Sequence, residues 1–327
     1  RDGAFGLVGS EMCIRDSPDV VCCPGHQPAD HDGRGAGVGL HRHAPGSLAV
    51  SMEQERAIAR KYIGGFPWLM VLWGLGGFAL WLSLFPLVHL GYLPLWAGFA
   101  LSLLVQSYCY LPSHEAEHGN IGRPNTRWRW LNEFIGHTSM FPIRIPYTLH
   151  RAIHLKHHAY TNDDHKDPDI GMRADTIWGA AYQSWRTRQP DSLGGLTPEV
   201  LDDNATKEQL IWEGFLVTRL WWLCLLLLCW TGFALEALML WWLPMQIAMI
   251  YTQITLSWAP HHPMRETGRY RDTRIWKSPV GTVLSSGMEY HFIHHLFPSI
   301  PLNRHPEVYR EMKPLLQEAG MRIEGDL

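Results

Sequence analysis

The chain has 327 residues, and its 28 Lys and Arg residues nearly balance its 31 Asp and Glu residues, for a formal net charge of −3 at pH 7. This balance excludes a strongly basic surface, so no nucleic-acid partner is expected. The mean hydropathy of −0.12 would suit a soluble protein. However, the apolar residues are concentrated in a few segments, and this local pattern outweighs the average.

The first 51 residues show no regular hydrophobic period and are rich in Gly, Pro and His. Within them the stretch LVGSEMCIRDS, residues 7–17, resembles the translation of a sequencing-library adapter. We therefore interpret residues 1–51 as non-native or disordered sequence, and we place the functional domain at residues 52–327, starting at Met52. The Cys residues after this start lie in apolar segments and form no C-x-x-C pair, which predicts neither a disulfide framework nor an iron–sulfur site.

Four apolar segments are each long enough to cross a bilayer, because about 20 helical residues span roughly 30 Å. No Asp, Glu, Lys or Arg occurs between Tyr62 and His114, and Glu236 marks the turn between the last two segments. Buried helices of a large soluble core are the alternative, and the flanking Trp residues count against it. The sequence thus predicts an all-α integral membrane protein with four transmembrane helices, at about residues 66–85, 93–111, 217–235 and 239–258.

In each pair of apolar segments, basic residues flank the outer ends, where the chain enters the first segment and leaves the second. Arg56, Arg60 and Lys61 precede the first segment, and the loops at the opposite ends carry no Lys or Arg. By the positive-inside rule, we expect both termini and every long polar segment in the cytoplasm. We expect no secretory signal, because no short apolar region with a cleavage site precedes the spans.

Histidines gather in the polar segments that follow the spans. HEAEH supplies an H-x-x-x-H pattern, two further stretches each supply H-x-x-H-H, and SWAPHHP follows the last span. Spacings of three and four residues place imidazoles on one face of a helix. An even number of spans separates these clusters, so we expect them together in a cytoplasmic helical cap. The histidines are His114 and His118; His154, His157 and His158; His261 and His262; and His291, His294 and His295.

Such clusters on one face of a membrane domain favour a shared metal site over chance. Eight or nine imidazoles are too many for one ion, whereas two ions would each have four or five and keep room for oxygen or water. The absence of thiolate ligands argues against copper(I) and cluster chemistry. Iron is favoured, because a site beside the lipid suits O2-dependent attack on unactivated C–H bonds. Zinc and copper stay open.

Other interpretations of HEAEH remain. An intramembrane zinc hydrolase would use His114, His118 and a glutamate base, but it leaves both H-x-x-H-H clusters without a role. Glu115 and His118 also form E-x-x-H, as in soluble carboxylate-bridged di-iron bundles, but a second copy is missing. A haem site would need axial histidines in the spans, where only the loop residue His89 is near. A non-catalytic metal-binding membrane protein is a weaker option.

The order of the clusters and the paired spans resemble the membrane fatty acid desaturase superfamily over about Lys61 to Gly320. The sharpest parts of this resemblance are NEFIG, HLKHHAYTNDDHKDPDI, APHHP and YHFIHHLFPSIP. The chain is most similar to the carotenoid-ring hydroxylase branch, the plant- and cyanobacterial-type β-carotene hydroxylases. The first box departs from that branch, since Glu115 and Glu117 stand where one acid and small residues are expected.

The resemblance implies two non-haem iron ions and a set of imidazole ligands. His261 matches the additional ligand after the fourth span better than His262, and His150 has no counterpart. Asp167 and Asp169 are expected to orient ligand imidazoles through the far ring N–H, with a turn or helix cap as the alternative. The implied catalytic ligands are His114, His118, His154, His157, His158, His291, His294 and His295, with His261 completing the metal set.

The resemblance also implies O2-dependent removal of hydrogen from a lipid methylene, which ends in an alcohol or in a double bond. The lipid, a fatty acyl chain or a carotenoid ring, would enter from the bilayer. Because the chain has no flavin motif, nicotinamide motif or C-x-x-C cluster, an external electron donor, ferredoxin or cytochrome b5-like, is expected to dock on the basic cytoplasmic face.

Overall fold

The computed structural model describes residues 45–189, 205–277 and 281–324. Most of the segment 1–51, for which we predict a non-native origin, lies outside these residues. Its last residues form the start of helix α1, Pro45–Arg60, which continues through Met52. The placement of the domain start at Met52 therefore stays a prediction.

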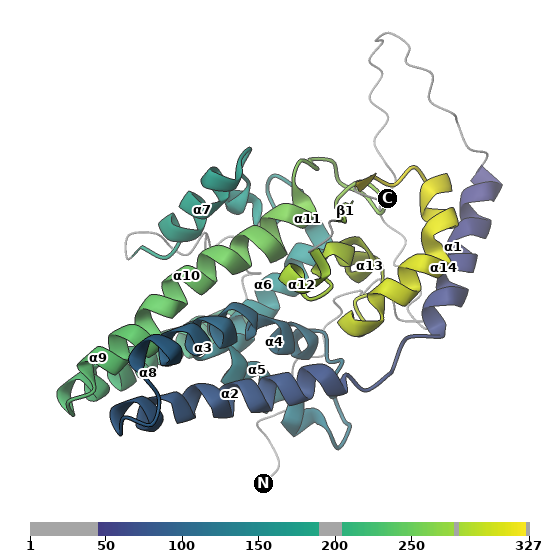
Figure 1. Cartoon of the computed structure of the whole chain (residues 1–327). Coiled ribbons are helices and arrows are strands. Elements are labelled where there is room, and N and C mark those ends of the chain that lie inside the picture. Colours follow the sequence, from purple (N-terminus) through teal and green to yellow (C-terminus); the bar gives the residue numbers. More distant parts are fainter. Residues whose placement is uncertain (1–44, 190–204, 278–280, 325–327) are drawn as a thin grey trace.

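Long apolar helices form one end of the molecule (Figure 1). Among the described residues, three helices have the length and composition to cross a membrane: Trp68–His89 (α2), Thr206–Trp230 (within α8, Ala205–Trp230) and Ala234–His261. The third contains α9 (Ala234–Glu236), α10 (Leu243–Thr252) and α11 (Ala259–His261), joined by the π-helical segments Ala237–Trp242 and Gln253–Trp258.

The predicted second span, 93–111, is divided in the structure. Helix α3, Leu95–Tyr108, has only 14 residues, and the short helix α4, Tyr110–Glu117, follows after Cys109. Fourteen residues extend about 21 Å, less than the hydrocarbon thickness. Every residue of α4 is buried, including the polar ones, which places this half of the expected span inside the protein. Four spans are therefore not confirmed.

The turn between the last two spans also lies earlier than expected. α8 ends at Trp230, and the chain reverses at Gly232, whose φ of +95° favours glycine. Glu236 belongs to the next helix, where its carboxylate lies 3.0 Å from Nδ1 of His89. The predicted boundaries 217–235 and 239–258 are thus corrected to a span that starts near Thr206 and to one that starts at Ala234.

The outer faces of these helices indicate a lipid environment. Only 17% of the apolar window of α8 is buried inside the protein, and Leu220, Leu226 and Trp230 are exposed. A helix that is apolar all round and mostly uncovered is stable where lipid surrounds it. The protein is an integral membrane protein by this criterion.

Polar contacts join the spans from within. The Leu240 carbonyl, in the first π-helical segment, accepts hydrogen bonds from Trp81 Nε1, Ser102 Oγ and Gln106 Nε2. The wider turns of a π-helix interrupt the regular backbone hydrogen bonds of the α-helix, and side chains of neighbouring helices donate hydrogen bonds to the backbone there. These bonds fix α2 and α3 against the last span.

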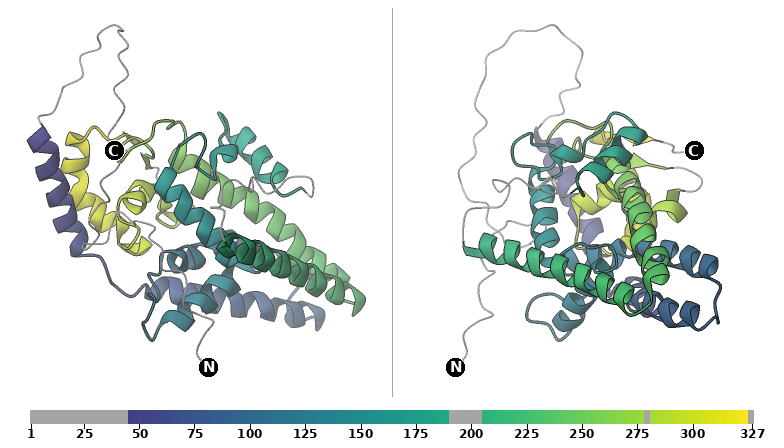
Figure 2. Two further views of the ribbon diagram at one scale, coloured as in Figure 1. Left: turned by 180° about the vertical axis from the view of Figure 1, so that it is seen from behind. Right: turned by 90° about the vertical axis from the view of Figure 1, so that its left-hand side faces the viewer.

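A helical cap follows at the other end of the molecule (Figures 1 and 2). Helix α1 lies beside α14 and contributes Ala59 to a core built around α13 and α14. Strands β1 and β2 form one short parallel pair. The remaining elements are α5 (Arg129–Met140), α6 (Tyr147–Tyr160), a 3₁₀ turn (Ile170–Met172), α7 (Ile177–Arg186), β1 (Ile275–Trp276), α12 (Gly281–Ser285), 3₁₀ turns (Met288–Tyr290 and Leu302–Arg304), α13 (His291–Leu296), α14 (His305–Glu318) and β2 (Ile323–Glu324).

Candidate metal centre

Eight of the nine predicted ligand histidines meet in two neighbouring groups. Within each group the candidate ligand atoms all lie within 4.8 Å of one another. The first group draws on the end of α4, on α6 and on α13; the second draws on α6, α11 and α13. The groups are His114, His118, His154, His158 and His294, and then His157, His261 and His295.

The ninth predicted ligand, His291, borders the second group. Its Nε2 lies 2.9 Å from Nε2 of His295, and its ring centroid is 5.2 Å from that of His261. His262, the alternative to His261, stacks instead on Trp258 with ring centroids 4.7 Å apart. The structure therefore brings His291 and His261 to the centre and leaves His262 outside it.

The spacing between imidazole nitrogens fits bound metal. Nε2 of His118 lies 2.9 Å from Nε2 of His154, and Nε2 of His294 lies 2.9 Å from Nε2 of His158. One ion that binds two nitrogens at about 2.1 Å each, at a right angle, holds them about 3.0 Å apart. In addition, both ring nitrogens of buried His114 have no hydrogen-bond partner among the described residues. A metal ion between these rings would bind one of the two nitrogens.

Local structure explains how distant segments reach one point. In α6, the spacing of His154, His157 and His158 turns all three rings toward α4 and α13. α4 ends at Glu117, and Gly119, with a φ of +71°, reverses the chain immediately after His118. On the other side, Gly287 has a φ of +93° and precedes the turn that leads into α13. Glycine tolerates this left-handed conformation at no steric cost.

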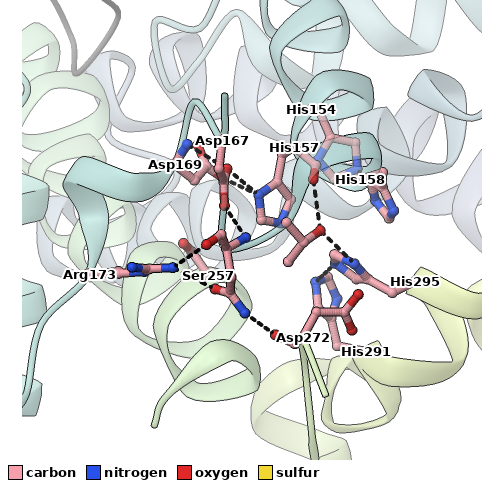
Figure 3. A network of polar contacts seen from close by, with 12 residues as sticks. His154, His157, His158, Asp167, Asp169, Arg173, Ser257, Asp272, His291 and His295 are labelled. Carbon is pink, nitrogen blue, oxygen red and sulfur yellow. Dashed lines mark hydrogen bonds and ion pairs between the residues drawn. The ribbon is translucent and has the colours of Figure 1, made fainter. Parts of the chain in front are cut away.

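Oxygen atoms orient two rings of the second group (Figure 3). His157 Nδ1 lies 2.8 Å from Asp167 Oδ1, and His295 Nδ1 lies 3.3 Å from Thr161 Oγ1. Burial lowers the pKa of His157, but the Asp167 carboxylate more than offsets this effect and raises it to about 9. With Asp167 at Nδ1, Nε2 is the ring nitrogen left for a metal ion, which would replace the proton on that nitrogen.

Burial keeps most of the other imidazoles neutral. It lowers the pKa of His158, His294 and His295 well below the usual value, and the neighbouring imidazoles lower it further. Neutral imidazole is the form that binds metal. These three imidazoles are therefore in the form that can bind a cation.

Glu117 is a site residue that the sequence interpretation set aside. Its carboxylate is fully buried, 2.7 Å from His150 Nδ1 and 3.8 Å from His154 Nε2. His150, which had no counterpart in the resemblance, is therefore linked to the first group through Glu117. Glu117 stands directly before His118 in HEAEH, and this position was the only indication of its role in the sequence. Its burial became known only from the structure.

Glu115, unlike Glu117, connects two segments of the chain through hydrogen bonds. Its carboxylate accepts hydrogen bonds from Asn120 Nδ2 and from the backbone N–H of Leu302. Burial raises its pKa to about 7. These bonds connect α4 to the segment that follows α13. A carboxylate engaged in this way is not free to activate water between His114 and His118.

Several other histidines in the described part of the chain lie outside the two groups. His89 pairs with Glu236 near the opposite ends of the spans, and His137 contacts the Tyr147 ring at 5.0 Å between centroids. His305 is fully buried, and its Nε2 lies 3.1 Å from the carbonyl oxygen of Ile300. Its ring centroid is 6.0 Å from that of His294.

A cavity of about 300 Å³ opens onto both groups. His154 and His157 are among the imidazoles in its wall, and apolar side chains such as Ile153, Met249 and Leu256 form much of the rest. Because Met249 and Leu256 belong to the last apolar helix, the cavity joins the spans to the imidazoles. Such a shape can hold an apolar chain against a metal centre.

Comparison with known proteins identifies the family. The model of the fatty acid desaturase family matches residues 90–325. The chain is also 25% identical, over 114 residues, to the sn-1 oleoyl-lipid 12-desaturase of Picosynechococcus sp.; the match covers 35% of this chain and only 25% of that relative. The family match includes all the histidines of both groups. The protein therefore belongs to the fatty acid desaturase family.

Proposed function

We propose that the protein is a membrane-bound non-haem di-iron oxidoreductase that uses O2 to desaturate or hydroxylate a lipid. The observation that carries this proposal is the meeting of eight imidazoles in two adjacent groups at one cavity between the spans and the cap. The family membership supports the same chemistry.

The two groups divide the ligands between two ions. His114, His118, His154, His158 and His294 would hold one iron, and His157, His261, His295 and neighbouring His291 would hold the other. Bound iron would supply the binding and reduction of O2 that removal of an unactivated hydrogen requires. Ligand sets made of imidazole nitrogens without thiolate suit iron. Metal analysis would distinguish iron from zinc and copper.

The protein's own side chains position the metal and the substrate. Asp167 holds the His157 ring in one tautomer, and Thr161 does the same for His295. Ile153, Met249 and Leu256 place an apolar chain against the imidazoles and keep water out. Glu117 places a buried carboxylate beside the first group, where it contacts both His150 and His154.

Desaturation and hydroxylation both need an external reductant. Conversion of a CH2–CH2 unit to a double bond by O2 consumes two electrons and two protons and releases two waters; hydroxylation consumes the same and releases one. We propose that a ferredoxin or a cytochrome b5-like protein supplies the electrons at the cytoplasmic face. Both termini and the histidine cap are proposed to lie on that side, as the basic residues around Arg60 and Arg269 favour.

Two substrate classes stay within this proposal, acyl lipids and carotenoid rings. The similarity to the sn-1 oleoyl-lipid 12-desaturase of Picosynechococcus sp. supports the first. The residue pattern of the clusters supports β-carotene hydroxylation as the alternative. A membrane zinc hydrolase is disfavoured, because Glu115 is engaged by Asn120 and Leu302, and because the other clusters share the site of His114 and His118.

The deciding experiment is expression of the chain in a β-carotene-producing bacterium, with pigments and membrane acyl chains both analysed. New double bonds would support a desaturase, and new xanthophyll would support the carotenoid alternative. If neither appears while a competent donor is present, both substrate assignments fail.

Metal analysis of the purified chain tests the centre itself. We expect about two irons per chain, and we expect His157→Ala and His294→Ala to abolish turnover and to lower bound iron, because each removes a ligand of a different group. His262→Ala is the matched control and should retain both properties, since His262 stacks on Trp258 outside the groups. One zinc per chain, or full iron and activity in both ligand variants, would contradict the assignment.

A further inference from the structure

Two arginines line the same cavity as the imidazoles, and the proposed reaction does not involve them. Arg144 follows α5 and Arg188 follows α7, and both contribute to the cavity wall. Their charges are close enough to interact: burial and then the positive charge of Arg144 lower the pKa of Arg188 to about 10. Like charges gathered at one cavity favour a negatively charged occupant.

Neither guanidinium has a counter-charge in the parts of the chain that the structure describes. Arg188 donates from Nη1 to Ser184 Oγ, while its Nε and Nη2 are buried without a hydrogen-bond partner there. Arg144 is partly buried and stacks on Trp221 and Trp222, with distances of 5.6 and 5.7 Å to the ring centroids. Arg188 is half-buried, but its buried Nε and Nη2 lack acceptors, which is unfavourable, so a ligand that supplies acceptor oxygens would relieve it.

The backbone at Arg144 also indicates a binding role. Its φ is +60°, a left-handed conformation that is unfavourable for a residue with a long side chain. Bonds from the N–H groups of Arg144 and Ile145 to the carbonyls of Phe141 and Met140 maintain this turn. Strain of this kind is concentrated at ligand clamps and active sites.

We propose that Arg144 and Arg188 bind the anionic head group, a carboxylate or a phosphate, of an amphiphilic acyl lipid whose chain lies along the cavity against the imidazoles. This inference rests on the proposed function and narrows its substrate class. Planar guanidinium groups match the paired oxygens of both anions. Ile145, Leu149 and Ile153 offer an apolar wall for the chain in the same cavity. An uncharged carotenoid would leave both guanidiniums without acceptors.

Equilibrium binding to the metal-free full chain in maltoside micelles tests this inference, with native mass spectrometry as the readout. The probes are oleate, oleyl alcohol, dioleoylphosphatidic acid and inorganic phosphate. Oleate and oleyl alcohol share one chain, so their difference in affinity reports the charge. We expect oleate or the phosphatidic acid to bind about tenfold or more tighter than the alcohol, as charge-assisted hydrogen bonds would give.

The double variant Arg144→Gln, Arg188→Gln should lose this preference while its affinity for oleyl alcohol stays unchanged. Arg219→Gln is the matched control, because Arg219 packs over the Phe215 ring and is absent from the cavity wall. If the double variant does not fold, the double variant Arg144→Lys, Arg188→Lys replaces it. Lysine keeps the positive charge but lacks the planar guanidinium group, so this variant should retain only part of the preference for oleate over oleyl alcohol.

Three results would overturn the inference: equal binding of oleate and its alcohol by the wild-type chain, full anion preference in the double variant, or displacement of oleate by an equal concentration of inorganic phosphate. The binding measurement needs neither iron nor O2. Oxidation of lipid without anion preference would therefore contradict this inference alone. Anion preference without oxidation of any lipid would contradict the proposed function alone.

Discussion

Asp167 and Asp169 stand two residues apart, yet their relations to His157 differ. Asp167 is buried and lies 2.8 Å from His157 Nδ1, whereas the nearer Asp169 oxygen is 3.7 Å away and its side chain is 39% exposed. Asp167 also accepts hydrogen bonds from the backbone N–H groups of Asn162 and Asp169. It therefore both caps the turn and holds the imidazole, so the two alternatives drawn from the sequence coexist in one residue.

This difference predicts unequal effects of neutral substitutions. Asp167→Asn should lower bound iron and turnover about 10- to 100-fold, because the negative charge that fixes the His157 tautomer is lost. Asp169→Asn is the matched comparison, and its effect should be several-fold smaller. Iron content and turnover of both purified variants are the measurements. Equal losses in the two variants would show that Asp167 does not act through His157.

Helix α3 depends on a close approach to its neighbours. A Cβ atom at Gly98 would lie 2.6 Å from Val88 Cγ2 and 2.9 Å from Leu240 Cδ2. The same helix supplies Ser102 and Gln106 to the Leu240 carbonyl, so its distance from the last span is fixed by hydrogen bonds. Small residues permit such contacts between helices in membranes.

We predict that Gly98→Ala lowers the free energy of unfolding by about 1–3 kcal/mol through overpacking. Gly77→Ala in α2 is the control, since its Cβ would meet nothing nearer than Val105 Cγ1 at 3.7 Å. That substitution should be neutral or stabilising, because alanine favours the helix by up to about 1 kcal/mol. Thermal unfolding in detergent measures both. A Gly98→Ala protein as stable as the control would show that α3 can shift without cost.

At the scale of the whole molecule, the spans and the histidine cap are continuous. The last apolar helix ends at His261, a member of the second group, and α4 carries His114 directly from the end of α3. The histidine groups therefore lie where the helices leave the apolar region, and the turn between α8 and α9 lies at the far end of the same helices (Figure 1).

This arrangement predicts opposite exposure of two sites in intact cells. In a cysteine-free background, Thr231→Cys at the far turn should react with a membrane-impermeant maleimide added outside. Glu266→Cys, just after the last span, should react only after lysis, because the basic residues around it favour the cytoplasm. Thr231 and Glu266 are both exposed, so protection would report the membrane and not burial. The reverse labelling pattern would invert the proposed topology.

The sequence by itself predicted the all-α membrane class, the positions of most apolar helices and the histidines that meet at the centre. These features follow from local signals, namely long uncharged runs and imidazoles spaced three or four residues apart. Their roles as iron ligands, like the O2 chemistry, stay predictions, whereas the superfamily to which these motifs pointed is confirmed.

Only the tertiary structure decided the division of the second span, the place of the turn at Gly232, the separation of eight histidines into two groups and the burial of Glu117. Each of these depends on contacts between segments far apart in the chain, such as α6 with α13 or Glu115 with Leu302. Hydrophobic period and residue spacing specify which face a side chain takes on its own helix. They contain no information on which other helix that face meets, and the metal centre and the arginine pair exist only where such faces meet.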